Sequence, residues 1–205
     1  MARSGPLTKT PASLALGLAQ IRVGSASENI ATATPVLTEN DSIGSLAQTK
    51  FTNEVEYWTH SSGFPALEDQ VYPLSESPKL ECQFEELTPA NLAIAMGKDP
   101  SEFSDVHTGT IKLGAMAEPV RIRMEAVYTY PSGKHTMTII FPMAQVTSAT
   151  ELDFQSADSI KSPLTFEAKR ADSGIEGGNA AWNAMPMGCI TFAAVSSGSS
   201  GSSGS

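Results

Sequence analysis

The residues of this chain whose types could support chemistry are three histidines, two cysteines and a few clustered acids. Metal sites need ligands at short, regular spacings, such as two histidines four residues apart on a helix. His60, His107 and His135 are scattered and show no such spacing. The sequence also contains no Gly-rich phosphate loop and no dinucleotide-binding fingerprint. We therefore expect no metal and no cofactor.

Two polar clusters have the residue types of catalytic sites but lack the spacing. The run from Ser104 to His107 contains a serine, an aspartate and a histidine, yet catalytic triads are assembled in space rather than along the chain. Glu85 and Glu86 follow each other in a strand pattern, so their side chains should point to opposite faces and cannot share a proton. We expect a protein that is not an enzyme.

Both cysteines are expected to be free thiols. Cys82 alternates with Leu80 and Phe84, which predicts a small buried side chain. With only Cys82 and Cys189 present there is no disulfide framework, and a bond between the two is the less favoured alternative.

Length and composition are typical of one soluble domain assembled in the cytoplasm. No stretch of the 205 residues approaches the roughly 20 apolar residues of a membrane span, and the apolar run at residues 12–19 is too short and broken for a secretion signal. The formal net charge of −9 disfavours a surface that binds nucleic-acid phosphates, although a repelling surface would let DNA slide past. Residues 196–205 form a Ser/Gly linker of engineered appearance, which leaves residues 1–195 as the domain.

Alternating apolar and polar residues predict an antiparallel β-sheet with one buried face. The clearest run extends from Val120 to Tyr130, and a Pro-Ser-Gly-Lys turn leads into the next. Pro142 should mark a strand end, a bulge or an edge. Arg121, Arg123 and Glu125 share the polar face, where we expect a solvated or inter-strand ion pair. The strands that we expect are residues 20–24, 51–57, 80–84, 110–114, 120–130, 136–141, 146–154, 164–168 and 190–193.

One helix is expected at residues 88–97. Thr88 can cap its free N–H groups, Pro89 suits the first helical position, and Gly97 can adopt the left-handed conformation that ends it. Residues 25–50 show little periodicity and are expected to form an extended arm or loop.

Residues 59–79 are expected to form a long loop between two strands. Four glycine and proline residues interrupt it, and its content is too apolar for a solvated segment, so we interpret it as a docking element. Trp182 lies in a late Gly-rich loop. We weigh two interpretations for it, a buried core position and a contact between subunits. The candidate subunit-contact residues are Phe64, Pro65, Leu67, Asp69, Tyr72 and Trp182.

The order of several short segments between residues 80 and 192 resembles the major tail tube proteins of long-tailed bacteriophages. None of these segments carries chemistry, and it is their order that is characteristic. They are residues 87–93 (LTPANLA), 125–128 (EAVY), 135–142 (HTMTIIFP), 151–153 (ELD), 163–173 (PLTFEAKRADS), 178–182 (GNAAW) and 188–190 (GCI).

The resemblance implies a β-sandwich or half-barrel with a flanking helix. Such subunits form hexameric rings whose sheets join into one inner barrel, and the rings stack into a tube through which DNA passes. The loop at residues 59–79 would reach the neighbouring ring. The partners would be further copies of the chain and the initiator and terminator proteins of the tail, in a virion. The alternatives are a tube protein of a contractile or secretion-type injection system, and a monomeric β-sandwich binding module.

Overall fold

The computed structural model describes residues 17–65, 67–103, 105–114, 118–154 and 160–195, and these residues form a mostly antiparallel β structure with two short helices. The seven strands are β1 (Gln20–Ser25), β2 (Leu46–Ser62), β3 (Leu67–Phe84), β4 (Ile122–Thr129), β5 (His135–Val146), β6 (Ser162–Ala168) and β7 (Cys189–Ala194). The helices are α1 (Ala26–Asn29) and α2 (Pro89–Ala95), with 3-10 turns η2 (Glu39–Asp41), η3 (Pro100–Glu102) and η4 (Ala180–Trp182).

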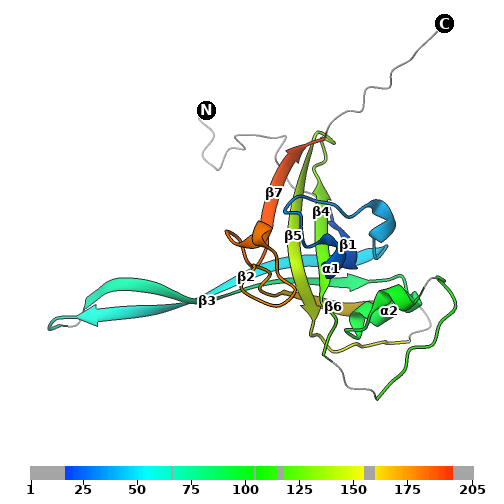
Figure 1. Ribbon diagram of the computed structural model, residues 1–205, viewed down its shortest axis with the longest axis horizontal. Helices are drawn as coiled ribbons and strands as arrows, with labels where there is room; N and C mark the ends of the chain where they lie inside the picture. Colours follow the sequence, from blue (N-terminus) through cyan, green and yellow to red (C-terminus); the bar gives the residue numbers. More distant parts are fainter. Residues whose placement is uncertain (1–16, 66, 104, 115–117, 155–159, 196–205) are drawn as a thin grey trace, which may run out of the picture.

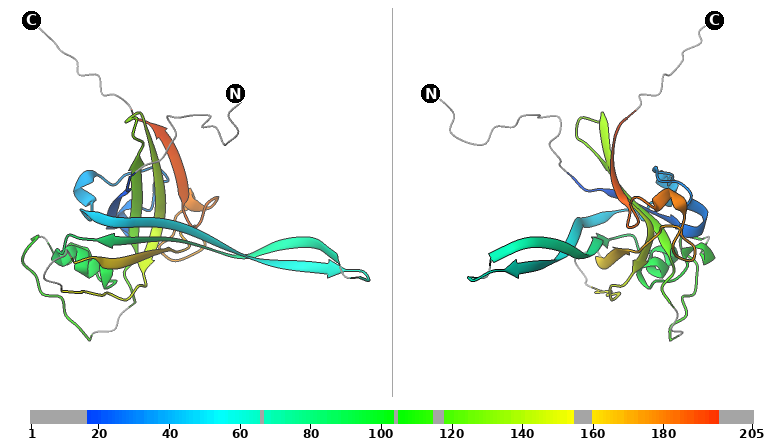
Figure 2. Two further views of the ribbon diagram at one scale, coloured as in Figure 1. Left: turned by 180° about the vertical axis from the view of Figure 1, so that it is seen from behind. Right: turned by 60° about the vertical axis from the view of Figure 1, so that its left-hand side comes forward.

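All seven strands belong to one sheet, which folds over on itself. The strand order is β1-β4-β5-β6-β3-β2, and β7 pairs with β5. The first half of β5 lies beside β7 and its last residues lie beside β6, so β5 belongs to both halves of the sheet. In Figures 1 and 2, β4, β5 and β7 stand upright while β2, β3 and β6 cross them at a steep angle. The result is a β-sandwich-like fold.

The main core lies between the two halves of the sheet. Strand residues such as Met124, Phe141, Leu80 and Phe166 fill it, and none of them is more than 2% exposed. A smaller cluster on the other side of β5 packs Ile140 and Met143 against the loop that carries Trp182. The predicted apolar face is confirmed here, because the residues at every second position meet across the fold. The expectation of one buried face is wrong for β4 and β5, because residues 122–126 and 138–144 are buried on both faces.

Pro142 lies within β5 at a bulge, which was one of the three expected outcomes. Ile122 pairs with Ala144 and Met124 pairs with Phe141, so Pro142 and Met143 together face Arg123. A bulge bends a strand and needs no ladder bond from the extra residue, which suits proline. The bend lies between the part of β5 beside β7 and the part beside β6.

Helix α2 forms as the sequence predicts. The Thr88 hydroxyl accepts a hydrogen bond from the Asn91 amide at 3.1 Å, and Pro89 occupies the first helical position. Gly97 follows the helix with φ +67°, a conformation that favours glycine. Ile94 and Ala95 pack on the main core.

Several predicted strand limits are wrong. Residues 110–114 and 147–154 are irregular, although their side chains alternate in polarity. Residues 25–50 hold α1, η2 and the start of β2 rather than one extended loop. Alternation is a necessary feature of a half-buried strand, but a strand also needs a neighbour to receive its backbone hydrogen bonds.

Candidate functional site

The predicted loop at residues 59–79 is instead a β-hairpin. Strands β2 and β3 are paired from Leu46 and Phe84 out to Ser62 and Leu67, and only the proximal part of β3 also pairs with β6. We call residues 54–65 and 67–77 the arm. It leaves the body of the molecule as a twisted two-stranded ribbon (Figures 1 and 2). The predicted loop is wrong because proline was taken to exclude a strand. A ribbon with a free edge tolerates proline within a strand.

The arm exposes large apolar side chains along its whole length. Trp58 and Tyr72 are cross-strand partners whose rings stack at a centroid distance of 5.9 Å, and His60 lies beside Trp58 on the same face. Phe64 at the turn is completely exposed. The other arm residues exposed by about half or more are Tyr57, Leu67, Val71 and Leu74. Groups of exposed aromatic residues on a projecting element are typical of protein contacts.

Asp69 shapes the tip of the arm. It is the extra residue of a bulge between the pairs His60–Gln70 and Ser61–Glu68. Its carboxylate accepts a hydrogen bond from the Ser62 hydroxyl at 2.7 Å and lies 2.8 Å from Nδ1 of His60. These two bonds, first that of Ser62 and then that of His60, lower the pKa of Asp69 from its usual value. The side chain that was predicted as a contact residue thus bonds within its own hairpin.

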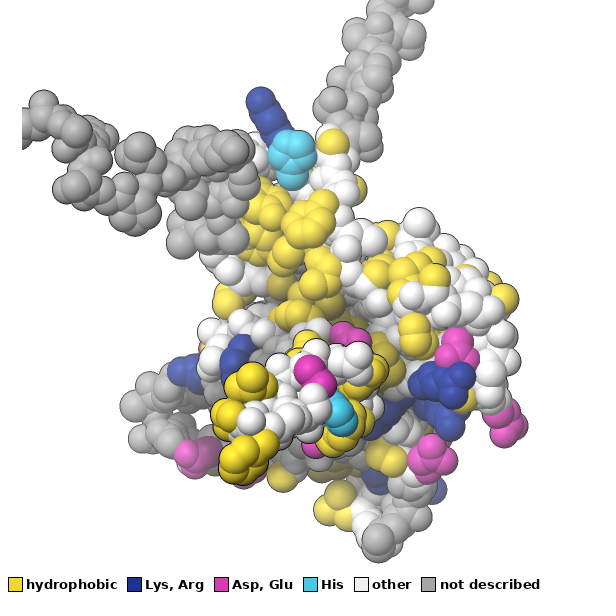
Figure 3. Space-filling model, turned by 90° about the vertical axis from the view of Figure 1, so that its left-hand side faces the viewer, with side chains coloured by type: hydrophobic (Ala, Val, Ile, Leu, Met, Phe, Trp, Pro, Cys, Tyr) yellow, Lys and Arg dark blue, Asp and Glu magenta, His cyan; other side chains and the backbone are white. Residues whose placement is uncertain are grey.

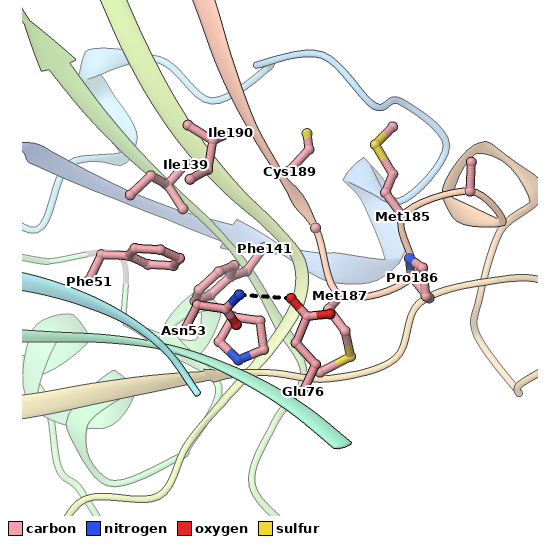
Figure 4. Close-up of a pocket in the computed structure, with 13 residues that line it drawn as sticks. Phe51, Asn53, Glu76, Ile139, Phe141, Met185, Pro186, Met187, Cys189 and Ile190 are labelled. Atoms are coloured by element: carbon pink, nitrogen blue, oxygen red, sulfur yellow. Dashed lines mark hydrogen bonds between the residues drawn. The ribbon is translucent and has the colours of Figure 1, made fainter. Parts of the chain in front are cut away.

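An apolar cavity of about 380 Å³ opens at the base of the arm. Phe51 of β2, with Ile139 and Phe141 of β5, forms one side, and Met187 and its neighbours before β7 form the other (Figure 4). Asn53 donates a hydrogen bond to Glu76 at 2.8 Å across the two strands of the hairpin beside this cavity. The sequence contained no signal for this cavity, because the four segments that line it lie apart along the chain.

A wall of apolar side chains continues from the cavity over the upper part of the sheet. Ile190 pairs with Ile139 and Phe192 pairs with Met137, so the four side chains lie on one face. Strands β2, β3 and β6 cover only the lower part of this face, and Ile190 and Phe192 stay 45% and 69% exposed. Figure 3, viewed along the arm, shows hydrophobic side chains in a column above it. We call Met137, Ile190 and Phe192 the apolar wall.

Two sheet edges have no strand partner within the described part of the chain. Strand β2 ends the order of the sheet, and β7 pairs with β5 alone. The outer edge of β1 differs, because Ser42 forms a bridge with Arg22 and the Ile43 amide donates to the Ile21 carbonyl. Unpaired edges are sites where a further chain can add.

Trp182 is a core residue, so its place among the expected subunit-contact residues is corrected. Its side chain has no exposed surface, and its indole N–H donates to the Ile30 carbonyl at 2.7 Å. The Arg123 guanidinium lies 5.8 Å from the centre of its ring. The remaining candidates Phe64, Pro65, Leu67 and Tyr72 all lie on the arm.

The expected solvated or inter-strand pair of Arg123 and Glu125 is in fact a buried pair within β4. Neither side chain is exposed, and their closest atoms are 2.8 Å apart. Arg123 also donates to the carbonyls of Asn29, Thr32 and Thr34, while Glu125 accepts from the amides of Val36 and Leu37. We call residues 29–37 the strap. Its groups cover the polar face of β4, which removes that face from water.

The polar clusters with catalytic residue types have structural partners. Asp105 accepts hydrogen bonds from the backbone amides of His107 and Thr108, which lowers the pKa of Asp105 and forms a tight turn; Ser104 lies outside the described residues. Glu86 accepts from the Ser45 amide. Within the described ranges, no three His, Cys, Asp or Glu side chains gather as a metal site would require.

Both cysteines are free thiols, as the sequence predicts. Cys82 of β3 is buried in the main core, and this burial raises the pKa of its thiol to about 12. Cys189 is half-buried, and desolvation raises the pKa of its thiol as well. Neither thiol is activated for nucleophilic chemistry, which needs a lowered pKa.

Comparison with known proteins gives no family assignment. No protein-family model and no curated protein matches this chain. Among the helices of the described residues, none has the length and apolar character needed to cross a membrane.

Proposed function

We propose that this chain is a structural subunit that assembles with copies of itself into stacked hexameric rings, forming the tail tube of a bacteriophage and a conduit for its DNA. The observation that carries the proposal is the arm. A two-stranded ribbon is marginally stable alone, and this one keeps its aromatic side chains in water in the isolated chain. An element of this kind gains its full stabilisation only when a partner covers it.

Ring formation would use the sheet edges. The free outer edges of β2 and β7 leave backbone groups without a strand partner in the described chain. Adding a strand from a neighbouring copy satisfies such groups, and a closed ring leaves none at its ends. The segment order that resembles tail tube proteins favours a ring of six, with the sheets joined into an inner barrel.

The charge of the chain agrees with a conduit. Six copies would carry 6 × −9 = −54 formal charges, and a negative lumen repels phosphate so that DNA moves without adhering. In this proposal DNA is cargo, and the protein partners are further copies, an initiator and a terminator.

Of the two alternative functions, only the second predicts a different particle in solution. A tube protein of a contractile or secretion-type injection system would also form rings. A monomeric β-sandwich binding module would remain a monomer and would bind its ligand through an exposed aromatic face. The arm favours assembly, because its aromatic residues lie on a projecting ribbon rather than in a concave site.

The test is to measure the size and shape of the particles that the purified protein forms at low and high concentration. Sedimentation velocity gives the size, and negative-stain electron microscopy gives the shape. We expect rings or tubes with a central channel. A monomer at every concentration, including in the presence of a preformed ring initiator, would contradict the proposal.

The matched control shortens the arm. Glu54 and Ser77 are cross-strand neighbours, so replacing residues 55–76 by Asn-Gly closes the hairpin with a two-residue turn. No buried core residue lies in the deleted segment, so the variant should keep its fold and melting temperature. We expect it to form no tubes. Tubes formed by this variant would show that the arm is not the assembly element.

A further inference from the structure

We propose that the tip of the arm of one copy docks into the apolar cavity at the arm base of a second copy, with the flank of the arm lying on the apolar wall. This inference rests on the proposed self-assembly and names the receiving site. The inserted residues are Phe64 and Pro65. The receiving residues are Phe51, Phe141 and Met187, next to Ile190 and Phe192.

The tip cannot reach the cavity of its own chain. Asn53 lines the cavity and Gly63 lies in the turn, and paired strand residues connect the two. Ten strand residues span roughly 30 Å. The ribbon leads away from the body in both views of Figure 2. An occupant supplied by this sequence must therefore come from another copy.

The chemistry of the tip matches that of the cavity. Phe64 is fully exposed at the tip, and the cavity is lined by the partly exposed ring of Phe51 and by two methionines, Met185 and Met187. Aromatic pairs and flexible thioethers accommodate an inserted ring well. The Phe51 ring is 36% exposed and lies 6.4 Å from the buried Phe141 ring, so an inserted ring would contact mainly Phe51.

The area of contact favours a second copy over a small ligand. A stable interface buries about 800 Å² on each partner, which is more than one cavity provides. The face of the arm that carries the stacked pair adds Trp58 and Tyr72. Each is about half exposed, so each adds roughly half of the 150–250 Å² that a fully buried aromatic side chain contributes. The wall continues directly from the cavity through Ile190, so one extended surface receives both tip and flank.

Docking of this kind propagates. The tip and the cavity are different surfaces of one chain, so each docked copy presents a free tip or a free cavity to the next. Such a contact joins copies in series, whereas contact between two arms would stop at a dimer.

The experiment is disulfide cross-linking of assembled protein. The variant Leu67→Cys/Asn53→Cys keeps Phe64 and places one thiol beside the tip and one at the cavity mouth, and Cys189→Ala removes the native thiol that lines the cavity. Oxidation requires Cα atoms within about 7 Å, so a bond reports docking. We expect a ladder of dimers, trimers and higher multimers on a non-reducing gel. The matched control is Leu67→Cys/Lys134→Cys with the same Cys189→Ala substitution, which places the second thiol on an exposed turn, and we expect no ladder from it.

The outcomes separate this inference from the proposed function. Rings or tubes that give no ladder from the tip–cavity pair, or an equal ladder from the control, overturn the docking and leave assembly standing. Absence of any assembly in the unmodified protein overturns both. As a second measurement, Phe64→Glu should raise the concentration needed for assembly at least tenfold, while Phe64→Leu should raise it less. Equal assembly of the two variants would also overturn the docking.

Discussion

At the scale of single residues, the buried pair of Arg123 and Glu125 shows how an irregular segment is held on a sheet. The strap has backbone groups that no strand pairs with, and buried groups of this kind must find partners. Arg123 bonds three of its carbonyls, and Glu125 accepts from two of its amides. Two opposite charges on one strand thus organise nine residues that are distant in sequence.

Replacing Arg123 by methionine should destabilise the protein by about 3–5 kcal/mol, because Glu125 would remain buried without its cation. Urea unfolding followed by circular dichroism measures this loss. The control is Arg121→Met, two positions earlier, where the side chain is 44% exposed and should change stability by no more than about 1 kcal/mol. Equal effects of the two substitutions would show that burial of the pair is unimportant.

Asp172 should make stability depend on pH in the acidic range. Its carboxylate accepts from the Arg170 guanidinium at 2.5 Å and from the Gly174 amide at 2.7 Å, and these bonds lower the pKa of Asp172. A lowered folded-state pKa gives stability that is complete above the unfolded value of about 3.8 and is lost as pH falls through the folded value.

The measurement is the difference in unfolding free energy between the native chain and Asp172→Asn from pH 6 to pH 2. The native chain should be the more stable at pH 6, and the difference should shrink as pH falls below about 3.8. A difference that is constant over the whole range would contradict the role of the carboxylate.

At the scale of elements, the arm is held together by its own cross-strand contacts rather than by the core. Trp58 stacks on Tyr72, and the Asp69 bonds close the tip. Cross-strand aromatic pairs contribute about 0.5–1.5 kcal/mol beyond the area that they bury. The arm should therefore open locally while the body stays folded.

Tyr72→Ala removes one ring of the stack and should raise amide hydrogen exchange in the arm severalfold. Exchange in β4 and β5 should stay unchanged, because no arm residue belongs to the buried core. Thr59→Ala, on the opposite face of the ribbon, is the control and should have a smaller effect. Faster exchange throughout the molecule would instead indicate that the arm and the body unfold together.

At the scale of the whole molecule, assembly must overcome repulsion between acidic copies. Each copy carries a formal charge of −9. Added salt shortens the distance over which these charges repel one another. The assembled fraction should rise between about 10 mM and about 100 mM salt, as the screening length falls from about 30 Å to about 10 Å. Sedimentation velocity measures this fraction, with the arm-shortened variant as the control. A fraction that decreases with added salt would mean that ion pairs between copies dominate.

The sequence by itself determined most of the elements that local patterns specify. Alternation identified the apolar positions of β4, β5 and β6 that face the main core, and the Thr88-Pro89 start and Gly97 end identified α2. These patterns succeed because a strand face and a helix cap depend on residues a few positions apart. The apolar content of residues 59–79 predicts a contact element, which stays a prediction, and the expected loop is a hairpin.

Only the tertiary structure decided which polar and apolar residues meet. The buried ion pair looked exposed in the sequence because the strap that covers it lies about 90 residues away. The arm was predicted as a loop because proline disfavours a strand. Only the pairing of β2 with β3 in the folded chain shows that both segments are strands. The cavity and the wall exist because β2, β3 and β6 cross only part of the sheet. Such features depend on long-range contacts, and a local pattern carries no information about them.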